Sequence, residues 1–153
     1  MANIFEPELE DASDRPEGWR WRYERIGPKI GAEKLGMSMY ELPPGQKSFP
    51  YHYEYPEEEW LICVAGRPTL RTPDGERQLD PGEVVCFPSG PKGAHQVRND
   101  TEEPVRVLIL STMTDPAVAV YPDSGKVLVA TSNTDDRAMF RQADAVDYWD
   151  GEL

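Results

Sequence analysis

The chain has 153 residues, 28 of them acidic and 16 basic, and its formal net charge is −12. This length fits one domain with a core of its own, and the negative charge argues against nucleic acid or an anionic membrane as a partner. No apolar run approaches the length of a membrane span, and no signal peptide is visible. The only cysteines, Cys63 and Cys86, both lie in apolar runs, which predicts buried, reduced thiols and a cytoplasmic protein.

Short apolar or alternating segments are separated by many turns, since the chain has 15 prolines and 12 glycines. This pattern predicts an all-β domain, a sandwich or closed barrel, because no long segment has helical periodicity. In chain order, the predicted strands cover residues 18–26, 37–42, 49–54, 59–65, 68–72, 76–79, 83–87, 94–98, 105–112, 117–121 and 126–130.

The chain divides into three predicted parts. Residues 1–18 form an acidic N-terminal arm, residues 19–114 the β-barrel, and residues 115–153 a C-terminal extension. The end of the extension is rich in aromatic residues, so we expect it to pack on the barrel. The aromatic face of Trp19–Tyr23 and the outward face of Trp60–Val64 also need cover, which predicts a homodimer.

Four polar residues stand out within the predicted strands. His52 and Glu54 share one strand face because successive side chains alternate. Glu59 begins the next strand, and His95 lies on a later one. Imidazole and carboxylate donors of this kind hold metal ions when they converge. The alternative is a structural polar cluster in the barrel core, and Glu57 and Glu58 compete with Glu59 for its role.

Two segments resemble the signature motifs of the cupin superfamily. In the first, Gly45 is followed by His52, and Glu59 is followed after six residues by Gly66. The second contains the residues Gly82, Pro88, Gly90, His95 and Asn99. The first motif normally has a second histidine where this chain has Glu54, and the second has a longer gap before its histidine.

The resemblance implies a jelly-roll barrel that holds one divalent metal ion with three histidines and a glutamate. Carried over to this chain, the ligands are His52, Glu59 and His95. Glu54 is then a fourth ligand, a catalytic general base, or the sign of a site that has lost its metal. The donor set suits Mn²⁺, Fe²⁺, Ni²⁺ or Zn²⁺ without selecting among them.

The resemblance also implies a small-molecule ligand and two classes of function. One is a metal-dependent enzyme, an oxidoreductase such as a dioxygenase, a decarboxylase or an isomerase. The other is a non-catalytic binding or sensor protein. We expect Leu61 and Cys63 to line an apolar interior with cations only at the rim, namely Lys47, Lys92 and Arg98. Such an interior favours a small acid or diketone over a sugar phosphate.

Overall fold

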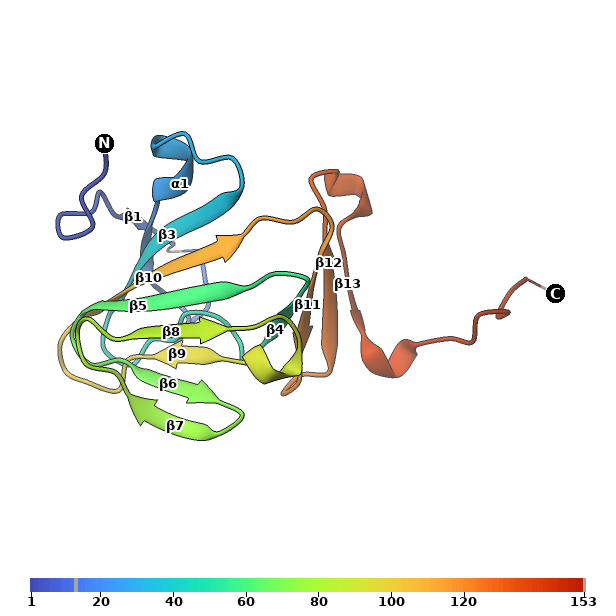
Figure 1. The fold of residues 1–153 in the computed structure, drawn as a ribbon. Coiled ribbons are helices and arrows are strands. Elements are labelled where there is room, and N and C mark those ends of the chain that lie inside the picture. The colour runs from blue at the N-terminus through green and yellow to red at the C-terminus, as the bar shows by residue number, and fades with distance from the viewer. Residues whose placement is uncertain (13, 153) are drawn as a thin grey trace.

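The computed structural model describes residues 1–12 and 14–152, in which thirteen strands form three antiparallel sheets. The largest sheet runs through the body of the molecule (Figure 1). Its strand order is β1 (Glu10–Asp11), β2 (Arg22–Arg25), β3 (Leu35–Leu42), β10 (Val105–Thr112), β5 (Glu59–Ala65) and β8 (Val84–Phe87). This architecture confirms the predicted all-β jelly-roll.

Two smaller sheets complete the molecule. One has the order β7 (Gly75–Gln78), β6 (Thr69–Thr72) and β9 (Gln96–Arg98). The other has the order β13 (Ala138–Arg141), β12 (Lys126–Ala130), β11 (Ala117–Tyr121) and β4 (Tyr53–Tyr55), and it stands across one end of the barrel (Figure 1). The helical pieces are short: α1 (Ile26–Lys29) and the 3₁₀ turns Pro91–Gly93, Thr134–Asp136 and Gln142–Asp144.

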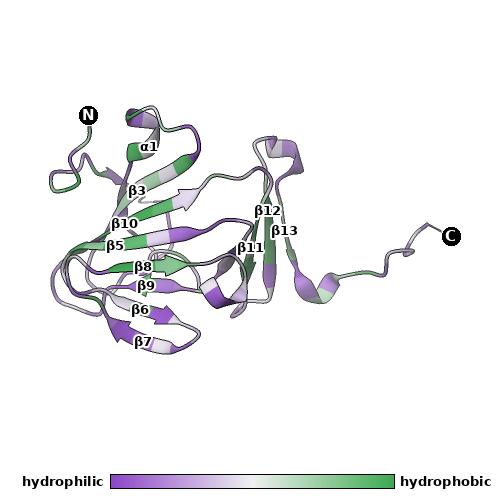
Figure 2. Ribbon diagram, in the orientation of Figure 1, coloured by the Kyte–Doolittle hydropathy of each residue, from purple (hydrophilic) through white to green (hydrophobic). Residues whose placement is uncertain are grey.

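The main core lies inside the barrel. It contains buried residues of β3, β5, β6, β8, β9 and β10, including Leu42, Leu61, Leu70, Val97 and Val107. Apolar colouring marks β8 and stretches of β3, β5 and β10 in the large sheet as well as β11 and β12, whereas β7 at the edge is hydrophilic (Figure 2). These alternating strands bury one face against the opposite sheet, which is why the short segments form a stable barrel.

Two aromatic residues of the first predicted strand, Trp21 and Tyr23, pack into this core. Trp21 is buried and makes edge-to-face contacts with Tyr23, Tyr40 and Phe49 at centroid distances of 5.2–5.4 Å. Its indole Nε1 donates to the Ser48 carbonyl at 2.7 Å. These rings are therefore covered within one chain, which leaves the outward face of Trp60–Val64 as the surface that predicts a homodimer.

A second apolar cluster lies on the outer face of the large sheet. Ile26, Met39 and Leu108 are buried there, and Ile4 and Leu9 of the N-terminal arm pack against them. The arm also pairs with the sheet through β1. No helix within residues 1–12 and 14–152 is both long and apolar enough to cross a bilayer.

Most strand boundaries agree with the sequence-based expectation, and four strands, β5, β10, β11 and β12, match in full. The predicted strand over residues 18–26 is shorter, since β2 covers only Arg22–Arg25 and Ile26 begins α1. Strand β13 was not predicted. The prediction of two buried thiols is right for Cys63 and wrong for Cys86, which is exposed.

The C-terminal extension has two different parts. Strands β11 and β12 join the sheet that contains β4, while the chain after β13 extends away from the body (Figure 1). The Tyr148 and Trp149 side chains on this tail are exposed. The division into arm, barrel and extension stays a prediction, and residues 13 and 153 within it lie outside the described structure.

Candidate metal centre

The two histidines lie directly opposite each other on neighbouring antiparallel segments. The His95 amide donates to the His52 carbonyl at 2.8 Å, and the His52 amide donates to the His95 carbonyl at 3.2 Å. Residues paired in this way project their side chains to the same face of the sheet. The imidazole centroids are consequently 4.7 Å apart, although the residues are far apart in the sequence.

Both imidazoles are held in the same orientation by backbone carbonyls. Nδ1 of His52 lies 2.8 Å from the Pro50 carbonyl, and Nδ1 of His95 lies 2.9 Å from the Gly93 carbonyl. A carbonyl oxygen only accepts, so each Nδ1 carries the proton and each Nε2 keeps a lone pair. This arrangement is the one found in histidines that bind metals through Nε2.

Glu59 completes a compact group of donors. It begins β5, pairs with Phe87 of β8, and places Oε2 3.4 Å from Nε2 of His95. One ligand atom from each of His52, Glu59 and His95 lies within 4.8 Å of the others. Donors bound to one ion at about 2.1 Å are about 3–4 Å apart, so these side chains need to close only slightly to share an ion.

Glu54 and Glu57 add two more carboxylates beside this group. Oε1 of Glu54 lies 3.9 Å from Nε2 of His52, as expected for side chains on the same strand face. Glu57 Oε1 accepts from the amide and hydroxyl of Thr114. Within the described part of the chain, no lysine or arginine lies within 4.0 Å of Glu54, Glu57 or Glu59. The residues present therefore fit a divalent cation, which would compensate their charge.

The ionisation of these groups follows from their burial. Burial lowers the pKa of His52 and lowers the pKa of His95 to about 3, so both imidazoles are neutral near pH 7. Burial raises the pKa of Glu54 and of Glu59, and the nearby Glu57 carboxylate raises both further. Neutral imidazoles have a lone pair for a cation, and a bound cation would stabilise the charged form of carboxylates that are costly to ionise without it. Both kinds of group therefore favour a bound cation.

Aromatic rings fix the walls around the histidines. Phe87 stacks on the His95 ring at a centroid distance of 3.8 Å and an angle of 6°. Tyr121 of β11 stacks on His52 at 5.7 Å and 22°. The C-terminal sheet thus contributes directly to the site, which the sequence pattern did not indicate.

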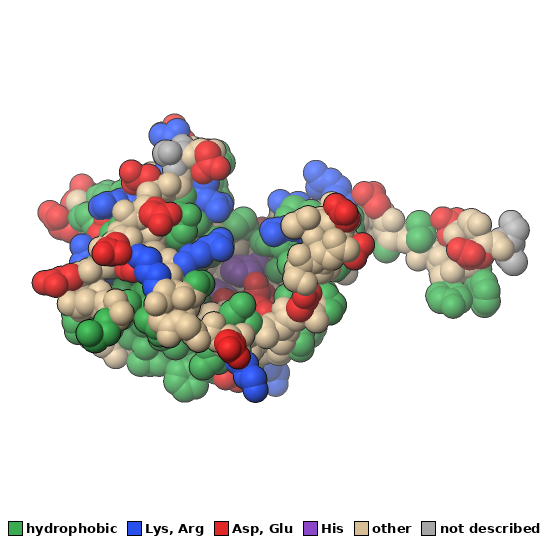
Figure 3. Space-filling model, turned by 90° about the horizontal axis from the view of Figure 1, so that it is seen from above, with side chains coloured by type: hydrophobic (Ala, Val, Ile, Leu, Met, Phe, Trp, Pro, Cys, Tyr) green, Lys and Arg blue, Asp and Glu red, His purple; other side chains and the backbone are tan. Residues whose placement is uncertain are grey.

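The donors lie at the floor of a cavity of about 480 Å³ between the barrel and the C-terminal sheet. In Figure 3 histidine appears at the bottom of a hollow, with acidic atoms beside it and basic side chains nearby. The basic side chains that line this cavity are Arg15, Lys126 and Arg137. They come from the N-terminal arm, β12 and the loop before β13, all distant in sequence from the histidines.

This lining corrects the sequence-based expectation of the interior. Leu61 and Cys63 are buried in the core and do not line the cavity. Of the three predicted rim cations, Lys47 lines an adjacent cavity, Lys92 lines neither cavity, and Arg98 is paired with Glu76 and Asp100. The expected preference for a small acid or diketone over a sugar phosphate rested on that lining and is not supported by the observed one.

Comparisons with known proteins agree with this fold. A sequence profile of the cupin domain matches residues 38–111. A sugar phosphate isomerase of the cupin superfamily from Silicibacter pomeroyi is 25% identical, with a TM-score of 0.82 and 98% of both chains covered. A proposed sugar phosphate isomerase from Acidithiobacillus ferrooxidans is 24% identical, with a TM-score of 0.82, covering 94% of this chain and 91% of the other.

A more distant solved structure is a cupin 2 conserved barrel protein from Salinispora arenicola. It is 27% identical, with a TM-score of 0.51, and the alignment covers 61% of this chain and 76% of that one. A comparison with curated proteins finds no significant match. The fold and the His–Glu cluster define a cupin barrel with a candidate metal centre. Residues 38–111 match the cupin domain, and the fold of the chain is that of the cupin superfamily.

Proposed function

We propose that the protein is a metal-dependent enzyme that isomerises a small oxygen-bearing substrate. The observation that carries this proposal is the convergence of His52, Glu59 and His95 within 4.8 Å at the floor of an accessible cavity. These three residues would hold one divalent ion, Mn²⁺, Fe²⁺, Ni²⁺ or Zn²⁺. Glu54, 3.9 Å from His52, is placed to act as a fourth ligand or as the proton acceptor.

When bound, the ion would polarise a carbonyl or hydroxyl oxygen of the substrate. The residues of the chain supply the rest. Glu54 takes a proton from the carbon next to the carbonyl and returns it to the former carbonyl carbon, while a proton moves between the two oxygens. One carbon is oxidised as its neighbour is reduced, so the reaction needs no external oxidant.

Two further observations support isomerisation over the other predicted reactions. Glu54 is partly buried beside the donors, with a side-chain exposure of 22%, as a positioned proton acceptor must be. The Silicibacter pomeroyi relative, which covers nearly the whole chain, is a sugar phosphate isomerase.

The test separates metal binding from proton transfer. Elemental analysis of purified protein should find about one divalent ion per chain, and His52→Ala and His95→Ala should lose it. Solvent deuterium should enter the substrate carbon when a panel of phosphorylated and free aldoses and ketoses is followed by NMR. Glu54→Gln should retain the metal but abolish exchange, with the exposed Glu102→Gln as a matched control.

Metal binding without deuterium exchange for any of these compounds would contradict the enzyme proposal and favour a non-catalytic binding protein. Failure to bind any of the four metals would also contradict the enzyme proposal and favour a non-catalytic binding protein. If Glu54→Gln releases the metal together with the activity, Glu54 is a ligand and another group accepts the proton.

We also propose that the protein is a homodimer in the cytoplasm. The outer face of the large sheet retains exposed apolar side chains, with Trp60 at 47% and Val84 at 53% exposure. Burying this face against a second copy would remove it from water. Light scattering should give twice the monomer mass, and Trp60→Lys should shift it to a monomer. A monomeric wild-type protein at micromolar concentration would refute the dimer.

A further inference from the structure

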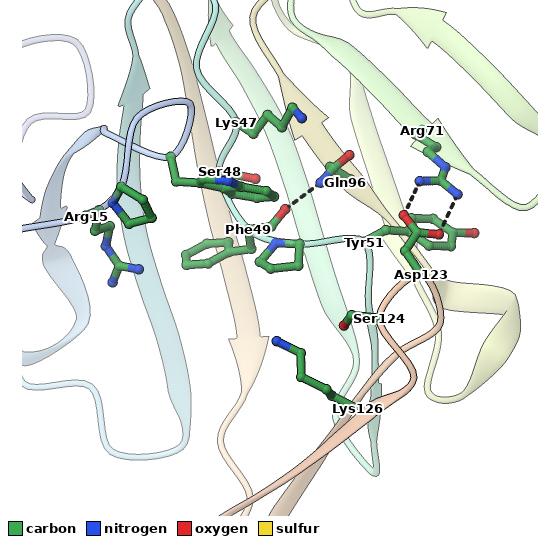
Figure 4. A pocket seen from close by; sticks show the side chains of 13 residues that line it. Arg15, Lys47, Ser48, Phe49, Tyr51, Arg71, Gln96, Asp123, Ser124 and Lys126 are labelled. Carbon is green, nitrogen blue, oxygen red and sulfur yellow. Dashed lines mark hydrogen bonds and ion pairs between the residues drawn. The ribbon is translucent and has the colours of Figure 1, made fainter. Parts of the chain in front are cut away.

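A second cavity adjoins the one that contains the candidate metal centre. Its volume is about 600 Å³, and it shares a wall with the first, formed by Arg15, Phe49, Pro50 and Lys126. Figure 4 shows Arg15 and Lys126 reaching this wall from different parts of the chain, with Phe49 between them. Lys47 lines the second cavity only. The two cavities therefore meet at a pair of basic side chains.

These basic side chains differ from most others in the chain because they have no acidic partner. Within residues 1–12 and 14–152, a carboxylate lies within 4.0 Å of seven lysines and arginines: Arg22, Lys29, Arg67, Arg71, Arg77, Arg98 and Arg106. None lies that close to Arg15, Lys47, Lys126 or Arg137. In a chain with net charge −12, unpaired cations gathered along one hollow indicate an anionic ligand.

The neighbouring arginine of the second cavity provides a contrast. Arg71 also lines this cavity, but Asp123 accepts two hydrogen bonds from its guanidinium at 2.6 and 3.0 Å (Figure 4). Its charge is compensated within the protein. The free charge of the cavity wall is therefore that of Arg15, Lys47 and Lys126.

Aromatic contacts hold the two shared cations in place. The Arg15 guanidinium lies over the ring of the buried Trp21, with Cζ 4.2 Å from the centroid. Lys126 Nζ lies 5.6 Å from the centroid of Tyr121, the ring that stacks on His52. A guanidinium stacked by its face keeps its N–H edges for an anion, and both groups are positioned relative to the candidate metal centre.

The distribution of charge in the first cavity determines how a ligand would be oriented in it. The floor of the first cavity is acidic, with Glu54, Glu57 and Glu59, and its upper wall is basic. The carboxyl groups of the floor offer no positive charge to an anionic group, whereas the basic wall attracts it. A substrate that carries both a neutral hydroxyl or carbonyl end and an anionic end therefore fits in one orientation only.

We propose that Arg15 and Lys126 form an anion subsite that binds the phosphate group of a phosphorylated substrate, with its oxygen-bearing end directed toward His52 and His95. A phosphate monoester suits two or more cations better than a carboxylate, because it carries more charge and offers three acceptor oxygens. Lys47 and Arg137 add positive potential on either side of this subsite. The inference rests on the proposed function, since it names the substrate class of the same cavity.

The test measures anion binding by the metal-free full-length protein, so that it does not depend on activity. Isothermal titration calorimetry at constant ionic strength should show that glycerol 3-phosphate binds and that glycerol does not. Arg15→Gln and Lys126→Gln should each weaken binding at least about tenfold, the loss expected for one charged hydrogen bond. Lys92→Gln and Lys34→Gln each remove one exposed charge outside both cavities and should leave the affinity unchanged.

Equal affinities in the cavity variants and the control variants would overturn the subsite. Binding of glycerate as tightly as glycerol 3-phosphate would overturn the assignment of a phosphate. Circular dichroism establishes that each variant is folded, and Arg15→Lys, which keeps the charge, should bind more tightly than Arg15→Gln. A protein that binds a divalent metal but no phosphate ester refutes this inference alone, whereas one that binds the ester but no metal refutes only the proposed function.

Discussion

Replacing Glu59 by glutamine should have opposite effects on stability with and without metal. Glutamine has nearly the same shape but needs no ionisation. Burial and the Glu57 carboxylate raise the pKa of Glu59 from 4.5 to about 7, and its side chain is only 15% exposed. Because the folded state then binds the proton more tightly than the unfolded state, ionisation at pH 8 costs about 1–3 kcal/mol of stability. In chelator at pH 8, the variant should therefore be more stable than the wild type by about this amount.

Bound metal should make the wild type more stable than the Glu59→Gln variant. At a free metal concentration of about 100 times the dissociation constant, the wild type gains about 2.7 kcal/mol. The variant lacks one of the three convergent donors and should gain much less. Urea unfolding at pH 8, in chelator and in saturating metal, measures both differences, and Glu102→Gln is the control for loss of an exposed carboxylate. A variant that is less stable than the wild type in chelator, or that responds equally to metal, would refute the reasoning.

The same pKa shift determines how the metal-free wild type responds to pH. A carboxyl with a raised folded pKa makes the protein more stable at pH 6.5 than at pH 8, because the folded state holds more protons in this range. Burial lowers the pKa of His95, to about 3, and that of His52, and both act in the opposite sense below about pH 7.5, where their unfolded forms begin to bind protons. Thermal unfolding between pH 6.5 and 8 should show falling stability with rising pH, with a smaller slope in Glu59→Gln. A rising stability over this interval would contradict the assigned burial of the carboxyls.

Three further substitutions or modifications test the fold around the site. Asn99→Ala should lower the free energy of unfolding in urea by about 2–4 kcal/mol. The buried side-chain amide donates to the Leu42 and Glu103 carbonyls and accepts from Thr101. A loss below about 0.5 kcal/mol would contradict this role. Gly93→Ala should destabilise the protein and weaken metal binding, since an added Cβ would lie 1.9 Å from the Pro88 carbonyl oxygen in the turn that anchors His95, and unchanged metal affinity would argue against that anchor. A thiol reagent should modify one cysteine quickly, identified as Cys86 by mass spectrometry, and Cys63 only on unfolding.

The strand pattern of the barrel was accessible to sequence reasoning because each buried strand carries a local signal. Glu59–Ala65 and Val105–Thr112 are apolar runs bounded by turn residues. Runs of this length and composition are typical of buried strands. The alternation rule also placed His52 and Glu54 on one face, as the 3.9 Å separation shows. β13 was missed because its residues are all exposed, so no buried periodicity marks it.

The sequence by itself determined the type of chain: short alternating strands, two histidines and acidic residues in motifs that resemble those of cupins. Only the tertiary structure decided what surrounds them. The pairing of His52 with His95 depends on the antiparallel register of two remote segments, and the approach of Arg15 and Lys126 depends on how the arm and the C-terminal sheet fold back on the barrel. Alternation is a relation between neighbouring residues, so it can be read directly from the sequence. A cavity wall is built from segments that are distant in the sequence, and no local pattern marks their contacts.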